Sequence, residues 1–312
     1  MRIVFMGTPD FAAVVLQGLI DHGHEVVLCL TQPDKQKGRG NKVQFSPVKE
    51  VALSHEIAVL QPERVRGDES VLQEIKALKP DISVVAAYGQ ILPEDVLNAP
   101  KYGSVNVHAS LLPKLRGASP IQHAILQGDE VTGVTIMQMG PGLDTGDMIS
   151  KVEVPIGDMN FMELHDRLAD EGRDLLLRTL DDIEAGNITL EKQDDSLSSY
   201  APMISKKDGH LDFSVKPEAI LNKIRAFDPW PGAYAVYNEK GESMKFWKGE
   251  KADMTTDEAD FGKIMMVDNN SFIVACGGGA VRITEIQVPG KKRCPVEDYL
   301  RGNSLEKGFL FK

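Results

Sequence analysis

The chain has 312 residues and a formal net charge of −11 at pH 7, a length that suggests two domains. Its apolar and charged fractions are those of an ordinary globular protein, and no apolar stretch is long enough to span a bilayer. Its acidity argues against general nucleic-acid binding. The first residues, Met1–Met6, are predicted to form a buried strand rather than a signal peptide. We therefore expect a cytoplasmic protein that contacts neither a membrane nor DNA. We also expect a monomer, although none of these features determines the oligomeric state.

The charge is unevenly distributed along the chain. Residues 1–205 contain 18 Lys and Arg against 30 Asp and Glu, a net charge of −12, whereas residues 206–312 contain 17 against 16, a net charge of +1. The C-terminal part either presents a basic face to a polyanion or reflects ordinary scatter, and charge alone does not decide between them. The three cysteines form no CxxC pair, so we expect reduced thiols and no metal site; they are Cys29, Cys276 and Cys294.

Short apolar runs alternate with amphipathic segments through the first half of the chain. The first helix is expected to have Thr8 as its N-cap, Pro9 as its first residue and Gly23 at its end, and a later helix stops at Pro80. Several runs are continuously apolar, as in a parallel sheet covered on both faces. This order predicts an α/β fold with a doubly wound, mostly parallel, Rossmann-like sheet. The predicted strands are Ile3–Met6, Glu25–Thr31, Ala58–Leu60, Asp81–Ala87, Ser104–Val107 and Val134–Met139.

The pattern changes after a long helix, which is expected at Phe161–Ala185 and is closed by Gly186. Residues 187–205 are mostly polar and are interpreted as a linker. The short strands that follow suggest a small β-barrel such as an OB-fold. The expected domains are therefore 1–186 and 206–312, joined by that linker. Strands of the second domain are expected at Ala233–Tyr237, Met244–Trp247, Lys263–Val267, Phe272–Cys276 and Val281–Ile286.

The turn after the first predicted strand lies where a dinucleotide-binding fingerprint would be. It lacks the G-x-G-x-x-G pattern, and Pro9 and Asp10 would obstruct a pyrophosphate at the start of the helix. A nicotinamide dehydrogenase is therefore disfavoured, although the fold class permits one.

The segment from Ser104 to Pro113 carries the clearest chemical signal. Asn106 and His108 are two residues apart at the end of a predicted strand, so their side chains project from the same face. The carboxyl ends of strands are where α/β sheets bind ligands, and an amide next to an imidazole can donate hydrogen bonds to a developing oxyanion. A lone His is more often structural, but an Asn-x-His pair followed by Ser-Leu-Leu-Pro favours a catalytic pair.

A glycine-rich loop, Met139–Asp147, follows the next predicted strand and contains two carboxylates. A carboxylate next to His108 would favour the imidazolium form and could accept a proton from an amine, directly or through water. An Asp between glycines also commonly caps a turn. The chemistry of the residues alone does not choose between Asp144 and Asp147.

These motifs resemble the formyltetrahydrofolate-dependent formyltransferase family, and the resemblance covers nearly the whole chain. Asn106, His108 and Asp144 match that family's catalytic trio, so the resemblance selects Asp144 over Asp147. It implies that 10-formyltetrahydrofolate donates a formyl group to an amine and that no metal takes part. It also implies folate-contacting residues in two loops, which are Gln90, Ile91 and Leu92 at the pterin end, and Ser110, Leu111, Leu112 and Pro113.

The acceptor is suggested by a basic run, Lys35–Lys42, within an otherwise acidic domain. Such a run either grips the phosphates of a tRNA acceptor end or is a solvated surface loop. The resemblance implies a tRNA contact, with Asn41 as a departure from the family pattern and Arg39 as the strongest candidate. The acceptor would then be the free α-amine of methionine esterified to initiator tRNA. The expected tRNA-contacting residues are Lys35, Lys37, Arg39, Lys42, Lys206 and Lys207, with Lys291–Arg293 extending the cationic track.

Three alternatives are weighed against this interpretation. An amino sugar nucleotide is the nearest alternative acceptor, because relatives use the same trio on other substrates, but the basic run and the Gly7–Phe11 turn favour tRNA. A formyltetrahydrofolate hydrolase would not explain the basic run or the extra barrel. A non-catalytic RNA-binding protein would not explain the intact trio.

Overall fold

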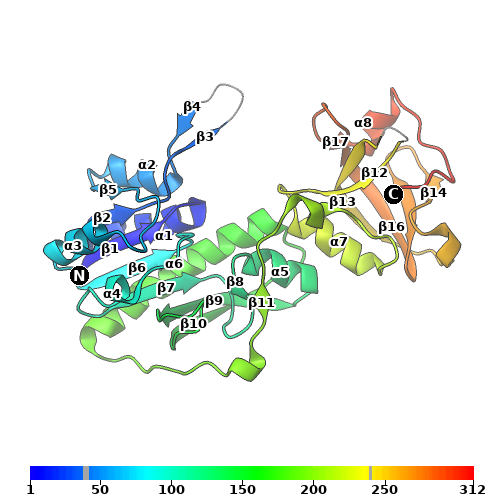
Figure 1. Cartoon of the computed structure of the whole chain (residues 1–312). Coiled ribbons are helices and arrows are strands. Elements are labelled where there is room, and N and C mark those ends of the chain that lie inside the picture. The colour runs from blue at the N-terminus through cyan, green and yellow to red at the C-terminus, as the bar shows by residue number, and fades with distance from the viewer. Residues whose placement is uncertain (38–41, 239–240) are drawn as a thin grey trace. The chain divides into compact units, whose positions relative to one another are not determined.

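The computed structural model describes residues 1–37, 42–238 and 241–312, and of residues 35–37, 42 and 43 it describes the backbone alone. The described chain forms two compact units, coloured blue to red along the chain in Figure 1. The domain limits expected from the sequence stay a prediction. Unit 1 comprises Met1–Pro120, Val131–Pro155 and His165–Ala201, and unit 2 comprises Ile121–Glu130, Ile156–Leu164 and Pro202–Lys312.

Unit 1 is built on a seven-stranded sheet in the order β10-β9-β7-β6-β1-β2-β5. The strands from β7 to β5 in this order are parallel, whereas β9 and β10 run antiparallel to their neighbours. The predicted doubly wound, mostly parallel sheet is therefore confirmed. The strands are β1 (Arg2–Gly7), β2 (Glu25–Leu30), β5 (Val59–Leu60), β6 (Ile82–Ala86), β7 (Ser104–His108), β9 (Val131–Gln138) and β10 (Met148–Pro155).

Helices cover both faces of this sheet (Figure 1). On one face, α3 (Glu69–Leu78) and α4 (Glu94–Leu97) share a buried cluster with Val4, Met6 and Val85 of the strands. The other face is covered by α1 (Asp10–Asp21) and α6 (Phe161–Ala185), and Gly172 of α6 lies against Val107 of β7. Alternate strand residues therefore enter opposite cores. The remaining helices of the first half are α2 (Pro47–Ser54) and α5 (Pro120–Gln127).

The start of α1 differs from the expectation. The N-cap position is Pro9, in an extended conformation, and the predicted Thr8 cap is wrong. The hydroxyl of Thr8 is engaged elsewhere, because it donates to the carbonyl of Tyr88 and accepts from the amide of Gln32, both at 3.2 Å. Thr8 thus ties together the loops that follow β1, β2 and β6.

The long helix α6 has the bounds that the sequence predicts, and Gly186 ends it with a φ of 71°. Within the described ranges, no helix is both long and apolar enough to cross a membrane.

Burial raises the pKa of the Cys29 thiol to about 12 and that of Cys276 to about 11, so both stay protonated at neutral pH.

Unit 2 contains an antiparallel sheet in the order β12-β13-β16-β15-β14, with β17 paired to β16. Each predicted strand starts within about two residues of its expected first residue, and β13 and β16 are longer than expected. The closure of this sheet into an OB-like barrel stays a prediction. The elements are α7 (Pro217–Ala226), β12 (Ala233–Val236), β13 (Ser243–Ala252), β14 (Ile264–Val267), β15 (Phe272–Cys276), β16 (Gly279–Gln287), β17 (Cys294–Pro295) and α8 (Val296–Leu300).

The core of unit 2 includes a cluster of four buried aromatic rings, Phe213, Phe246, Phe272 and Phe311. Their contacting pairs have centroids 5.3 to 6.5 Å apart, within the range in which aromatic rings attract one another. Phe311 contacts all three others, although it lies next to the end of the chain.

We predict that Phe311→Ala destabilises unit 2 by about 3–5 kcal/mol, because it removes a buried ring and leaves a cavity. Both tryptophans, Trp230 and Trp247, lie in unit 2, so urea unfolding followed by tryptophan fluorescence reports on this unit. Leu310→Ala is the matched control, since that neighbouring side chain is 43% exposed. An equal loss of stability in the two variants would contradict the role given to the ring.

Candidate active site

Two side chains of the candidate trio project from β7. Val107 faces α6, so the alternation of the strand places Asn106 and His108 on the opposite face of the sheet. Their residues are 9% and 6% exposed, respectively. Buried polar groups of this kind need partners, and the partners come from two loops.

The loop that carries Asp144 connects β9 to β10. Because β9 is antiparallel to β7, Gln138 at its end pairs with Val105, near the start of β7. The loop must therefore turn back across the sheet face for Asp144 to reach Asn106 and His108. Asp144 adopts a left-handed conformation with φ 51°, which Asp tolerates better than most residues.

The glycines of this loop allow close approaches of its backbone. A Cβ at Gly146 would lie 1.7 Å from the carbonyl oxygen of Gln138, and one at Gly142 would lie 2.1 Å from the hydroxyl of Thr145. A side chain at Gly146 would therefore displace the backbone of the loop, whereas one at Gly142 would force the Thr145 side chain to move. The folded path of the backbone thus requires a glycine at position 146.

The structure brings the trio together around one carboxylate. Asp144 Oδ1 lies 3.5 Å from Asn106 Nδ2, a long hydrogen bond, and 3.7 Å from His108 Nδ1. The other oxygen, Oδ2, accepts a shorter bond of 2.8 Å from the backbone amide of Gly117. One carboxylate oxygen is therefore anchored, and the other faces the amide and the imidazole.

The second nitrogen of His108 fixes its tautomer. Nε2 lies 3.0 Å from the carbonyl oxygen of Leu115, and because that oxygen only accepts, Nε2 carries a hydrogen. Protonation of the ring therefore adds its hydrogen at Nδ1, which faces Asp144. The imidazolium form would present an N–H toward the Asp144 carboxylate and the space next to it.

The second carboxylate of the loop belongs to Asp147, which lies at the start of the β9–β10 pairing. The backbone carbonyl of Asp147 accepts from the amide of Gln138 at 2.8 Å, next to the β9–β10 pairing. Among the ion pairs of the described residues, His108 is joined to Asp144 and not to Asp147.

The first predicted folate loop follows β6. The side chain of Gln90 bonds the backbone of the neighbouring segment, accepting from Val65 N at 2.9 Å and donating to Pro62 O at 3.0 Å. Leu92 is buried in the core against α3 and α4, whereas Ile91 is 75% exposed. Ile91 is thus the most exposed of these three side chains, Gln90 is partly exposed, and Leu92 is buried.

The second predicted folate loop follows β7. The hydroxyl of Ser110 is buried and donates to Lys114 O at 2.6 Å. Leu112 is also buried, in a cluster with Met137 and Met148. Leu111 and Pro113 are partly exposed, so the loop offers those two side chains, while Ser110 and Leu112 shape it from within.

Both loops leave the same edge of the sheet. β6 and β7 are adjacent and parallel, and β6 also pairs with β1. The strand order reverses at β1, because β2 and β5 lie on its other side. Carboxyl ends of strands at such a reversal are the usual ligand sites of open α/β sheets.

The predicted cationic contacts that the structure describes lie on a pair of strands in unit 1 and on two segments of unit 2. Lys35 and Lys37 lie on β3 (Lys35–Lys37) and Lys42 on β4 (Lys42–Gln44), two strands paired as an antiparallel hairpin. Arg39 lies outside the described residues. Lys206 and Lys207 are both exposed at the start of a 3₁₀ turn in unit 2.

The expected extension of the track at Lys291–Arg293 is only partly suited to a polyanion. Arg293 donates to Asp228 at 2.8 Å and to Glu285 at 2.5 Å. Its charge is therefore already paired with two carboxylates, and of this run Lys291 and Lys292 are the exposed residues.

Sequence reasoning missed two residues that contact the Asp144 loop and a third that binds one of them. Gly117 anchors the carboxylate through its amide, and Gln193 binds the loop backbone through its side chain. Arg116 in turn binds Gln193. Gly117 lies on β8 (Arg116–Gly117), which pairs with β11 (Tyr200–Ala201). A glycine nine residues after His108 was the only signal for Gly117, and Gln193 lies in a polar stretch without a motif.

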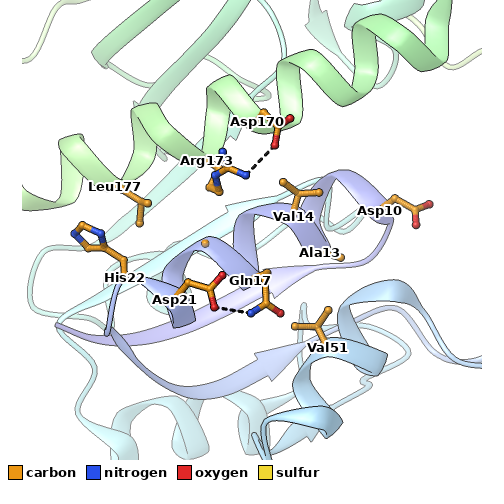
Figure 2. Close-up of a pocket in the computed structure, with 11 residues that line it drawn as sticks. Asp10, Ala13, Val14, Gln17, Asp21, His22, Val51, Asp170, Arg173 and Leu177 are labelled. Carbon is orange, nitrogen blue, oxygen red and sulfur yellow. Dashed lines mark hydrogen bonds and ion pairs between the residues drawn. The ribbon is translucent and has the colours of Figure 1, made fainter.

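A separate open cavity of about 640 Å³ lies between α1, α2 and α6, and Figure 2 shows the side chains that line it. Its polar groups satisfy one another, since Arg173 pairs with Asp170 and Gln17 donates to Asp21, both at 2.8 Å. No member of the trio or of the two folate loops lines it. We interpret it as a groove between packed surface helices.

With this geometry established, comparison with known proteins identifies the class. Residues 1–180 match the family described as Formyl transferase, and residues 203–304 match its C-terminal domain. The chain belongs to the formyl transferase family.

Curated relatives match the chain over nearly all of its length. A protein of Bacillus subtilis named methionyl-tRNA formyltransferase is 50% identical over 309 residues, which cover 98% of this chain and 96% of the relative. A protein of the same name from Geobacter metallireducens is 47% identical, covering 99% and 97% of the two chains.

Solved structures of lower identity share the fold. WlaRD, a sugar 3N-formyl transferase solved with dTDP and 5-N-formyl-THF, has a TM-score of 0.67 at 22% identity and covers 94% of this chain and 99% of its own. HypX from Aquifex aeolicus, solved with tetrahydrofolic acid, has a TM-score of 0.62 at 17% identity, covering 96% of this chain and 47% of its own.

We predict that Gly117→Ala lowers the melting temperature more than Gly67→Ala does. Both glycines have positive φ, 113° and 87°, so both variants carry the strain of a left-handed residue, about 1–3 kcal/mol. A Cβ at Gly117 would also lie 2.6 Å from the Tyr200 ring and 2.7 Å from Ala201 O, whereas Gly67 has open space. Calorimetry checks this, and equal melting temperatures would show that β8 is not tightly packed.

Proposed function

We propose that this protein transfers the formyl group of 10-formyltetrahydrofolate to the free α-amine of methionine esterified to initiator tRNA, in the cytoplasm and as a monomer. The observation that carries the proposal is the convergence of Asn106, His108 and Asp144 around one partly free carboxylate oxygen. This arrangement occurs in a chain that is 47% to 50% identical, over nearly its full length, to proteins named methionyl-tRNA formyltransferase.

In the proposed reaction the amine nitrogen attacks the formyl carbon, and the carbonyl oxygen becomes negatively charged. Asn106 has an amide hydrogen beyond the one directed at Asp144, and protonated His108 has the hydrogen on Nδ1. Both can be donated to this oxygen. Such donors act best where water is excluded, and the buried β7 side chains meet that condition.

The proton balance is assigned to Asp144. As the new C–N bond forms, the amine must lose a proton, and Oδ1 can accept it directly or through water. The bond between the formyl carbon and N10 of the folate then breaks, and N10 takes up the proton that Asp144 accepted, so that no net proton is released. Because Oδ2 is held by Gly117, the carboxylate keeps Oδ1 directed toward the reacting atoms throughout.

The folate substrate is assigned to the carboxyl edge of β6 and β7. The exposed Ile91 and the partly exposed Leu111 and Pro113 offer apolar side chains at this edge. This suits a flat heteroaromatic pterin, which needs apolar contact on its faces and hydrogen bonds at its edge. We propose that the other three side chains of these loops hold the loop conformation; they are Gln90, Ser110 and Leu112.

The acceptor assignment rests on the basic hairpin and on the relatives. The hairpin carries Lys35, Lys37 and Lys42 on its strands, in a part of the chain that is otherwise acidic. An amino sugar nucleotide remains the alternative acceptor, because the same fold occurs in a sugar formyl transferase. That structure is only 22% identical to this chain.

The deciding experiment is formyl transfer from 10-formyltetrahydrofolate, with charged initiator tRNA compared against an amino sugar nucleotide. We expect turnover with the tRNA and little with the sugar. The reverse preference would replace the acceptor, and formate release without an acceptor would indicate a hydrolase. Binding of RNA with no folate turnover would leave the non-catalytic alternative.

We predict that Asp144→Asn nearly abolishes formyl transfer, whereas Asp147→Asn retains most of it. The amide keeps the size of the carboxylate but cannot accept the amine proton. Single-turnover rates at saturating substrates measure the chemical step, and Asp147→Asn is the matched control within the same loop. The opposite ranking of these two rates would overturn the assignment of Asp144.

We further predict that Arg39→Ala weakens the use of charged tRNA without changing folate affinity. Each lost phosphate contact should reduce the slope of log affinity against log salt by about 0.7 to 0.9. Lys37→Ala should act in the same direction more weakly, because Lys binds phosphate as a point charge and Arg can bind it bidentately. Unchanged tRNA kinetics and an unchanged salt slope for Arg39→Ala would contradict the proposed tRNA contact of the basic run Lys35–Lys42.

A further inference from the structure

The side chain of Gln193 binds the backbone of the Asp144 loop at two points. Its amide nitrogen donates to the carbonyl oxygen of Asp144 at 2.8 Å and to that of Gly146 at 2.7 Å. Both donor hydrogens of the amide are therefore used on this loop. Gln193 follows α6 in the sequence, 49 residues beyond Asp144, so the contact is tertiary.

The carbonyl end of the same side chain is bound by Arg116. Arg116 Nε and Nη2 donate to Gln193 Oε1 at 3.0 and 2.8 Å, and Nη2 also donates to Asp195. The next residue, Gly117, donates its amide to Asp144 Oδ2. The bonds therefore form a closed ring that runs from the Asp144 carboxylate through β8 and Gln193 to the Asp144 backbone.

This ring meets a need that the sheet itself does not meet. The loop starts near the amino end of β7 and has to fold back to reach Asn106 and His108, and it is rich in glycine. Glycine has the largest conformational freedom to lose, and Asp144 is held in a left-handed conformation. Hydrogen bonds to the loop backbone from residues outside the loop offset the entropy cost of ordering it.

We infer that Gln193, braced by Arg116, is a positioning residue that holds the Asp144 carboxylate in its reactive orientation. The expected effect on the reaction rate rests on the proposed function. The claim that Gln193 orders the Asp144 loop does not depend on it. A displacement of a reacting group by about 1 Å can cost roughly a hundredfold in rate. Gln193 lies outside both predicted folate loops, so we expect the affinity for folate to change little.

The kinetic test compares Gln193→Ala and Gln193→Glu with wild type in formyl transfer. We expect both variants to lower kcat by about 10- to 100-fold, with KM for each substrate within about twofold. Gln193→Glu has the same shape and can still pair with Arg116, but it replaces the two N–H donors with a carboxylate oxygen that repels the carbonyl oxygens of Asp144 and Gly146. Gln17→Ala removes a partly exposed Gln on α1 that donates a hydrogen bond to Asp21, and it is the matched control, expected to behave as wild type.

A double variant tests whether the ring acts as a unit. Arg116→Ala should also lower kcat, and Arg116→Ala combined with Gln193→Ala should fall little further than either change alone, because both break the same ring. Additive losses would show that the two residues act independently and would overturn the bracing role of Arg116.

Hydrogen exchange gives a readout that does not depend on activity. Amides of residues 140–147 should exchange faster in Gln193→Ala than in wild type or Gln17→Ala, while the amides of β7 should not change. If wild type transfers no formyl group, the proposed function fails and this measurement still decides the inference. Unchanged exchange, or a loss of melting temperature with kcat unaffected, would overturn it.

Discussion

The candidate site depends on one constraint, which is that the two oxygens of Asp144 have different partners. A carboxylate that is loose at both oxygens rotates, whereas the Gly117 amide holds one of them at 2.8 Å and leaves the other facing Asn106 and His108. Hydrogen bonds to charged groups contribute about 1.5–3 kcal/mol, enough to favour one orientation. The proposed proton acceptor is therefore oriented by a backbone group that titration cannot alter.

The sheet supplies the rest of the site through its strand order. Parallel β1, β6 and β7 bring their following loops to one edge, and Thr8 ties the first of these to the loop after β6. The antiparallel β9 breaks this rule, because its loop begins at the other end of β7. Bonds from β8 and from Gln193 hold that loop over the strand face, so a segment interpreted from its polarity as a linker contacts the candidate site.

Elements with a strong local signal could be predicted closely. β15 and α6 have the expected residues because the first is continuously apolar and the second has a long apolar stripe ended by a glycine. β10 was not predicted, because it is an edge strand whose exposed residues include Lys151 and Glu153 and which therefore lacks a continuous apolar run. The Thr8 cap was predicted wrongly because the hydroxyl finds partners 24 and 80 residues away, which no local pattern reveals.

By itself the sequence determined that Asn106 and His108 share a face, since strand side chains alternate with a period of two. It also determined the family, through motifs that span most of the chain. Only the tertiary structure decided that His108 presents Nδ1 to Asp144, that Gly117 anchors the carboxylate, and that Gln193 binds its loop. The reason is that these contacts join loops far apart in sequence, whose meeting depends on the strand order and on the direction of β9. A period or a motif describes neighbours along the chain, whereas the strand order decides which loops meet.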